Sequence, residues 1–275
     1  MNKNIYLRKI LVQNNLKGSD IKTNLEIIED IFLFKVIQYK ETRNINLIVN
    51  YYKDQQIDRS AEIDLCLKLN CVNKLFNRII IINETMKDID FIDKSDRIII
   101  LNNPNRLTFN EIFNISNDYS LENTTNILIN SDIVIGENFD NIKLDYAEWA
   151  FVLSRYNILD DGKINFCDDP GSFDTWIWEG KLKHNIGNYL MGKPNCDVLL
   201  ANELSQFYKM KNPSYDLKTY HVHNTNIRNY NISEKISGKY LKIKITDLKI
   251  IKTKKKETEA EKKEKILYLS DYIYG

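Results

Sequence analysis

Short apolar runs separated by polar turns recur along the first half of the chain. Residues 45–52 read INLIVNYY, and further runs occupy 78–82 (RIIII), 97–101 (RIIIL) and 126–129 (NILI). The last three are too short for helices and are apolar on both faces, as buried parallel strands are. Between the first two runs, the apolar residues of 59–69 recur at helical spacing. This alternation predicts an α/β sheet, with ligands gathered at the carboxyl ends of its strands.

The second half of the chain has a less regular pattern. Residues 144–154 (LDYAEWAFVLS) show helix-like spacing, and residues 160–230 are irregular and rich in aromatic residues, Asp, Gly and His. Loops of that composition on a rigid sheet commonly carry binding and catalysis. A strand-like run follows at 239–245, and the interleaved Lys and Glu residues of 252–265 predict a solvated helix with local ion pairs.

The composition is that of an ordinary globular protein. Hydrophobic residues make up 43% of the 275 positions and charged residues 28%, and this length favours one domain. The formal net charge of +1 counts against a nucleic-acid partner, because such proteins usually carry a basic excess. The four cysteines lack the spacing of a zinc site or a disulfide framework, so we expect reduced thiols. The first fifteen residues lack the pattern of a signal peptide or membrane anchor, so we expect a cytoplasmic protein with no transmembrane segment.

Two segments contain side chains that could bind a metal ion. Asn130-Ser131-Asp132 directly follows the apolar run at 126–129, and a carboxylate there is a hard oxygen ligand for a divalent cation. His221 and His223 alternate along an extended segment and would point the same way. One of them could complete the shell that Asp132 begins. The alternatives are a turn capped by Asp132 and two ordinary surface or core histidines.

The segment from Gly171 to Trp178 combines a carboxylate with two indoles. Asp174 could accept a proton from an attacking hydroxyl, and Trp176 and Trp178 could stack on the apolar face of a sugar. The alternative is a loop anchored by tryptophan burial, with Asp174 as a helix cap.

Four arginines are candidate partners for a diphosphate or a carboxylate, because the guanidinium fork matches such oxygens. They are Arg59, Arg106, Arg155 and Arg228. The alternative for each is an ordinary surface or ion-pair role.

Several of these segments occur in an order that resembles a known family. The blocks are Tyr51-Tyr52 with Arg59-Ser60-Ala61-Glu62-Ile63 and Asn70, Arg106-Leu107-Thr108-Phe109, Asn130-Ser131-Asp132-Ile133, Ser154-Arg155-Tyr156, Ser172-Phe173-Asp174-Thr175-Trp176-Ile177-Trp178, Gly192-Lys193-Pro194-Asn195-Cys196-Asp197, Asn212-Pro213-Ser214, and the run from His221 to Tyr230. Together they resemble the NSDI, S-x-D-x-W-I-F, G-x-P-G-C-D and H-x-H-x-S-x-x-R-x-Y motifs of GT-A-type glycosyltransferases from large DNA viruses and bacteria.

The resemblance covers residues 45–245 and leaves two accessory segments, 1–44 and the Lys/Glu-rich 246–275. The chain departs from the family at Asn195, where glycine is usual, and at Thr225, where serine is usual. Asn tolerates left-handed backbone geometry better than most residues, so the first departure is compatible with the loop.

The resemblance implies a GT-A-like, Rossmann-like fold with a mixed, mainly parallel sheet flanked by helices. It also implies a nucleotide-sugar donor, such as a UDP-sugar, and Mn²⁺ or Mg²⁺ held by Asp132 and by His221 or His223. Such a cation would stabilise the leaving diphosphate. The implied donor-binding residues are Tyr51, Tyr52, Arg59, Arg106, Asn130, Ser131 and Arg155. A glycan or other hydroxyl acceptor would meet Trp176, Trp178 and Asp197. Asp174 would act as the base if the anomeric centre is inverted, and would orient substrate if it is retained.

Two other functions are compatible with the same residues. The single carboxylate in Asn130-Ser131-Asp132 is also expected of a module that binds a sugar nucleotide or glycan without turning it over. A nucleotidyltransferase or a metal-dependent phosphoesterase could use the same ion.

Overall fold

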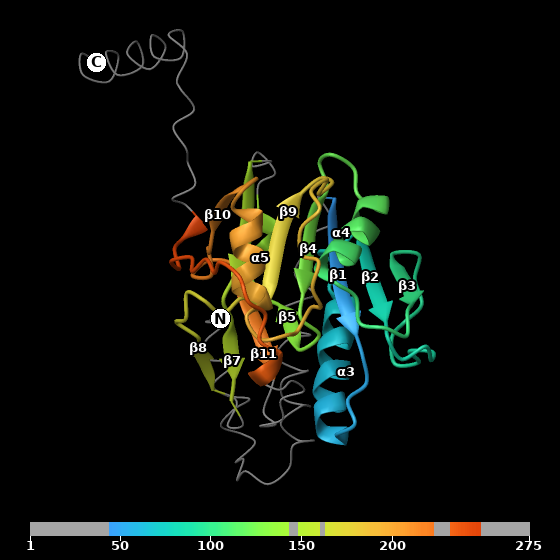
Figure 1. Cartoon of the computed structure of the whole chain (residues 1–275). Helices are drawn as coiled ribbons and strands as arrows, with labels where there is room; N and C mark the ends of the chain where they lie inside the picture. Colours follow the sequence, from blue (N-terminus) through green and yellow to red (C-terminus); the bar gives the residue numbers. More distant parts are fainter. Residues whose placement is uncertain (1–43, 143–147, 160–162, 223–231, 249–275) are drawn as a thin grey trace, which may run out of the picture.

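The computed structural model describes residues 44–142, 148–159, 163–222 and 232–248, and Figure 1 shows their arrangement. Its main feature in these ranges is a seven-stranded sheet of order β10-β6-β9-β4-β1-β2-β3. The strands are β1 (Ile45–Tyr51), β2 (Arg78–Asn83), β3 (Ile98–Asn102), β4 (Thr125–Ile129), β6 (Trp149–Leu153), β9 (Thr175–Glu179) and β10 (Lys209–Lys211). All pairs are parallel except those that β9 makes with β4 and β6. The expected mixed, mainly parallel sheet flanked by helices is confirmed.

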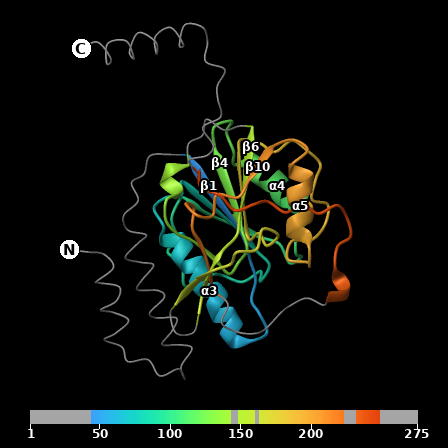
Figure 2. The same cartoon turned by 90° about the vertical axis from the view of Figure 1, so that its left-hand side faces the viewer.

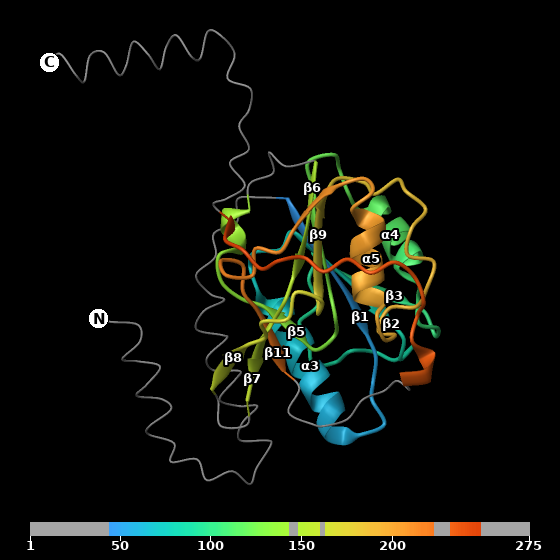
Figure 3. The same cartoon turned by 60° about the vertical axis from the view of Figure 1, so that its left-hand side comes forward.

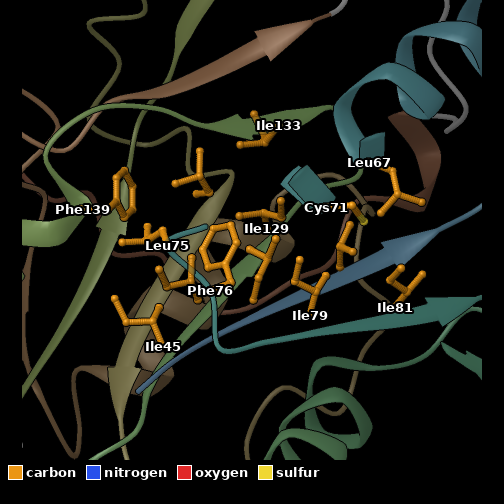
Figure 4. Close-up of a cluster of buried hydrophobic side chains, with 14 of the residues drawn as sticks. Ile45, Leu67, Cys71, Leu75, Phe76, Ile79, Ile81, Ile129, Ile133 and Phe139 are labelled. Atoms are coloured by element: carbon orange, nitrogen blue, oxygen red, sulfur yellow. The ribbon is translucent and has the colours of Figure 1, made fainter. Parts of the chain in front are cut away.

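Helices cover both faces of this sheet. Figures 2 and 3 show α3 (Ile57–Val72) on one side and α4 (Phe109–Asp118) and α5 (Cys196–Leu204) on the other. Because side chains alternate along a strand, Leu47 and Val49 of β1 pack in the cluster that contains α3, and Ile48 packs in the cluster that contains α4 and α5. In Figure 4, strand isoleucines such as Ile79 lie beside Cys71 of α3. The two buried clusters fix the sheet between its helices.

A smaller sheet packs against α3, where Leu65, Cys66 and Leu69 meet its strands. Its order is β5-β11-β7-β8, formed by β5 (Ile133–Ile135), β7 (Tyr156–Ile158), β8 (Ile164–Phe166) and β11 (Thr219–Val222). Strand β11 runs antiparallel to β5 and parallel to β7. Two short 3₁₀ helices complete the described elements, at Phe139–Asn141 and Ile232–Glu234. This sheet therefore brings three distant parts of the chain together just beyond the ends of β4 and β6.

The strands and the helix expected in the first half of the chain are confirmed within about two residues at most ends. The helix expected at 144–154 is wrong where the structure describes it, because Trp149–Leu153 forms β6. This strand lies between β9 and β10, so residues 150–153 are all buried and lack the alternation of a half-exposed strand. The strand expected at 239–245 is also wrong, since only Ile245 forms a bridge, with Asn212.

The irregular region expected at 160–230 contains a helix and several strands where it is described, so that expectation is only partly confirmed. The expected helix at 252–265 lies outside the described residues. The four cysteines are free thiols, as expected. Over the ranges that the structure describes, no helix combines the length and apolar character needed to cross a bilayer.

Candidate functional site

The candidate site lies at the carboxyl ends of the parallel strands. The chain runs from β1 outward to β2 and β3, and then returns to place β4 on the other side of β1. In an open α/β sheet, ligands bind at such a reversal of strand order. Tyr52 directly follows β1, and Asn130-Ser131-Asp132 follows β4. Asp174 lies at the same edge because β9 runs in the opposite direction and begins there.

Asp132 and His221 meet although they are 89 positions apart in sequence. Ile133 pairs with His221 across the β5–β11 ladder, and the backbone N–H of Val222 donates to the carbonyl of Asp132 at 3.0 Å. This register brings Nε2 of His221 to 3.1 Å from Oδ2 of Asp132. Both side chains are nearly enclosed, with 13% and 11% of their surface exposed. The expected convergence of the carboxylate and the first imidazole is therefore present, whereas His223 lies outside the described residues.

Arg59, in the first turns of α3, binds Asp132 from the other side. Its Nη2 forms a buried ion pair with Oδ2, and its Nη1 donates to Oε2 of Glu62 at 2.9 Å and to the carbonyl of Val222 at 3.2 Å. Burial alone would raise the pKa of the Asp132 carboxyl. Interactions with His221 and then with Arg59 outweigh burial and hold that pKa well below its usual range. Asp132 is thus a carboxylate at neutral pH.

The pair formed by Asp132 and His221 fits two positions of a divalent cation. Neighbouring ligands of an octahedral ion with bonds of about 2.1 Å are about 3 Å apart, which matches the separation of Oδ2 and Nε2. Within the described ranges no group of three or more His, Cys, Asp or Glu side chains could hold a metal. A cation bound here would need further oxygens, as Mg²⁺ does when substrate phosphates complete its shell.

Asp174 lies in a second cluster at the same edge. Its Oδ1 accepts from Nδ2 of Asn130 at 2.6 Å, and its Oδ2 forms an ion pair with Arg155. Arg155 also donates to the hydroxyl of Ser172 at 2.8 Å. Asp174 precedes a strand and continues the β4–β9–β6 pairing through backbone hydrogen bonds with Asn130 and Leu153, so its alternative interpretation as a helix cap is wrong. Asn130 therefore connects the end of β4 to the proposed base.

Asn157 of β7 joins the two clusters. Its Oδ1 lies 3.2 Å from Nε of Arg155 and 3.1 Å from Nδ1 of His221. A continuous set of polar contacts thus runs from Asp174 through Arg155, Asn157 and His221 to Asp132. Sequence reasoning missed Asn157. The only available signal was its position two residues after Arg155, which places both side chains on one face of an extended segment.

Tyr52 and Arg106 form a third part of the edge. The guanidinium of Arg106 lies over the ring of Tyr52, 4.7 Å from its centroid. Arg106 also forms an ion pair with Glu84, whose Oε1 accepts from Nδ2 of Asn50 at 2.5 Å. Glu84 directly follows β2, and Asn50 is the last residue but one of β1. Neither was predicted from the sequence, because isolated polar residues are too common in this chain to single out.

The structure places three of the expected binding residues in the interior. The ring of Tyr51 is 1% exposed, and its hydroxyl donates to Asp64 at 2.7 Å. Trp176 and Trp178 are 1% and 2% exposed and pack edge-on against phenylalanines of α4. Both indoles lie on the same face of β9, which packs against α4, and are therefore buried. This burial is incompatible with stacking on an acceptor sugar. The interpretation of the segment as anchored by tryptophan burial is the one that fits.

The expected residue Arg228 lies outside the described residues, and the two others lie beside the clusters. Ser131, between Asn130 and Asp132, is 9% exposed. Asp197, in the first turn of α5, accepts from the backbone N–H of Phe173 at 3.1 Å and so holds the residue before Asp174. Burial, reinforced by the charge of Asp174, raises the pKa of Asp197 to about 6.

Asn195 adopts the left-handed backbone conformation at the start of α5, with φ of 68° and ψ of 5°. Glycine adopts this conformation without strain, and Asn tolerates it better than most residues. The substitution of Asn for the usual glycine is therefore compatible with the loop.

Comparisons with known proteins add distant structural similarities only. No protein-family model and no curated protein matches the chain. A crystal structure of GalNAc-T7 with UDP, GalNAc and Mn²⁺ is similar, with 10% identity, a TM-score of 0.42, and coverage of 68% of this chain and 45% of that chain. The inositol-1-phosphate CTP transferase from T. maritima is similar with 11% identity, a TM-score of 0.40, and coverage of 71% and 94%.

The chain thus spans less than half of the GalNAc-T7 chain, and similarity at this level assigns it neither an activity nor a ligand. The resemblance to viral and bacterial glycosyltransferases stays a prediction.

Proposed function

We propose that the chain is a metal-dependent glycosyltransferase. It moves a sugar from a nucleoside-diphosphate sugar to a hydroxyl acceptor, and a UDP-sugar is the leading candidate for the donor. The observation that carries this proposal is the convergence of Asp132 and His221 to 3.1 Å, linked by polar contacts to Asp174 at the edge where strand order reverses. We infer a single domain for residues 1–275, with its motif-bearing core at about 45–245. A carboxylate and an imidazole that can share a cation, next to a second carboxylate, suit the departure of a diphosphate and the activation of a hydroxyl.

In this proposal Asp132 and His221 hold Mn²⁺ or Mg²⁺, with His223 as a further candidate ligand. When bound, the cation would neutralise the charge that develops on the leaving diphosphate. Arg106 and Arg155 would bind diphosphate or sugar oxygens through their guanidinium forks. Tyr52 would lie against the nucleotide. Arg59 supports the position of Asp132 through their ion pair, and Ser131 would contact the donor.

Asp174 would act on the acceptor. If the reaction inverts the anomeric centre, the acceptor oxygen bonds to the anomeric carbon, the bond from that carbon to the diphosphate oxygen breaks, and Asp174 takes the hydroxyl proton. An ionised carboxylate offers about four lone-pair positions, so the contacts with Asn130 and Arg155 leave it able to accept. These two contacts would orient Asp174. If configuration is retained, Asp174 would orient substrate instead.

The direct test is to incubate the purified chain with individual nucleotide sugars and Mn²⁺, and to identify the released products by chromatography. The proposal predicts release of nucleoside diphosphate from at least one donor, abolished by EDTA and restored by excess Mn²⁺. Release of pyrophosphate or nucleoside monophosphate would instead indicate a nucleotidyltransferase or a phosphoesterase. Metal-dependent UDP binding in calorimetry, without turnover of any donor in the presence of a broad set of glycan acceptors, would indicate a binding module.

A further inference from the structure

Arg155 fixes the orientation of the Asn157 side-chain amide. A guanidinium Nε is always protonated in proteins and can only donate. It lies 3.2 Å from the Asn157 atom assigned as Oδ1. A donor NH₂ group at that position would face another donor, so the atom that faces Arg155 must be the oxygen. The amide orientation thus follows from the chemistry of its neighbour.

The same oxygen fixes the tautomer of His221. Oδ1 of Asn157 lies 3.1 Å from Nδ1 of His221, and a carbonyl oxygen can only accept. Nδ1 must therefore carry a hydrogen. In a neutral imidazole only one nitrogen is protonated, so Nε2 then presents a lone pair. The β7–β11 ladder pairs Asn157 directly with His221 and holds the two side chains in this arrangement.

Nε2 of His221 faces Oδ2 of Asp132 at 3.1 Å. Without a metal, an imidazolium could donate Nε2–H to this oxygen. In the neutral ring, the lone pair of Nε2 faces the carboxylate, and a shared divalent cation would bind both atoms. Arg59 binds the same oxygen of Asp132 from α3.

We propose that Asn157 is a positioning residue, which accepts the hydrogen of Nδ1 so that Nε2 of His221 is presented as a metal ligand beside Asp132. The identity of the ion in this inference rests on the proposed function, whereas the tautomer of His221 follows from contacts within the chain. Metal-ligating histidines commonly donate their other ring N–H to an outer acceptor, and loss of that acceptor typically lowers metal affinity about 10–100-fold.

The test uses ¹⁵N-histidine-labelled full-length chain with Mg²⁺ and UDP at alkaline pH. The chain has three histidines, His184, His221 and His223, so single His→Gln variants assign the ring signals. Long-range ¹H–¹⁵N spectra distinguish a protonated ring nitrogen from one with a lone pair. We expect Nδ1 of His221 to be protonated and Nε2 to be unprotonated. A ring protonated at Nε2 in the metal-loaded chain would overturn the inference.

Variants separate positioning from folding. Asn157→Leu should shift His221 toward the Nε2-protonated tautomer and weaken Mn²⁺ binding, measured by electron paramagnetic resonance with UDP, by about 10–100-fold. Asn157→Asp keeps the acceptor oxygen and should retain the tautomer and most of the affinity. Asn165→Leu makes the same replacement on the paired, exposed position of β8 and should change neither.

Equal Mn²⁺ affinity and an unchanged tautomer in Asn157→Leu would contradict the inference. If the tautomer behaves as expected but no nucleotide sugar is turned over, the proposed function fails while the positioning role of Asn157 stands. If Asn157→Leu does not fold, the tautomer of the unmodified chain and the behaviour of Asn157→Asp still decide the question.

Discussion

Arg59 and Asp132 form a buried ion pair between the first turns of α3 and the end of β4, 73 positions apart in sequence. The exposed fractions of the two side chains are 5% and 11%. Arg59 also pairs with Glu62, which is 1% exposed. One guanidinium therefore contacts two buried carboxylates and helps to hold Asp132 where it meets His221.

Replacement of Arg59 by Met should destabilise the fold strongly. The variant keeps much of the side-chain volume but removes the buried positive charge that pairs with Asp132, which costs about 3–5 kcal/mol of unfolding free energy. Urea denaturation followed by circular dichroism measures the loss. The control is Lys209→Met at the pair with Glu148, where the two side chains are 57% and 75% exposed, and this variant should lose far less stability because solvent screens the pair. Equal losses in the two variants would show that the buried pair has no special role.

Replacement of Asp174 by Asn should separate catalysis from binding. The amide keeps the shape of the carboxylate but is a very weak base, so turnover of the best donor should fall about 10²–10⁴-fold. UDP affinity, measured by calorimetry, should stay within about threefold because Asp174 makes no proposed contact with the nucleotide. Asp168→Asn, in the same loop, should leave both quantities unchanged. Full turnover in Asp174→Asn would remove this residue from the mechanism.

The unfolding free energy should depend on pH through Asp197. Its pKa in the folded chain is raised to about 6, by burial first and by Asp174 as well, from an ordinary value of 3.8. The folded chain thus binds this proton more tightly than the unfolded chain, and stability from this group falls as pH rises from about 4 to about 6.

Asp197→Asn removes this titration and keeps an oxygen for the N–H of Phe173. The variant should be more stable than the unmodified chain at pH 7.5, by at most about 3 kcal/mol, and equally stable at about pH 3, where the carboxyl is protonated in both the folded and the unfolded chain. Denaturation curves at the two pH values measure the difference. A stability difference that is the same at both values would show that the carboxyl is not perturbed in this way.

Replacement of Arg106 by Gln should weaken donor binding. Hydrogen bonds to charged groups contribute about 1.5–3 kcal/mol, so loss of a contact with the diphosphate should raise KM for the donor roughly 10–100-fold with little change in kcat. Arg78→Gln is the control, because Arg78 lies at the opposite end of β2 and donates to the carbonyl of Tyr119. An unchanged KM in Arg106→Gln would show that Arg106 does not bind the donor and only forms its ion pair with Glu84.

Strand β3 lies at the edge of the sheet and Ile100 is 38% exposed, so its expected burial on both faces is wrong. Strands β1, β2 and β4 were predictable because each is a mainly apolar run buried on both faces. The same property misled the prediction for Trp149–Leu153, whose continuous apolar run does not distinguish a buried strand from a buried helix. Trp176 and Trp178 alternate with other residues, which is the pattern of a strand, but the preceding Gly and Asp residues favoured a loop.

The position of Asp132 was predictable from local sequence, because it directly follows a buried strand. Its contact with His221 depends on the register of β5 and β11, and no local pattern specifies a register between segments so far apart. Asn157 was unpredictable for a related reason. Its role depends on the contact with His221 on β11 as well as on the one with Arg155 just before β7, so it emerges only when the smaller sheet is assembled.

The central claim is that Asp132 and His221 hold one divalent cation together with a nucleoside diphosphate. Titration of Mn²⁺ into the chain with saturating UDP, followed by calorimetry, tests it most directly in the unmodified chain, Asp132→Asn, His221→Gln and the double variant. The account predicts one Mn²⁺ site, at least about tenfold weaker binding in each single variant, and little further loss in the double variant. Wild-type Mn²⁺ affinity in folded Asp132→Asn and His221→Gln variants would contradict it.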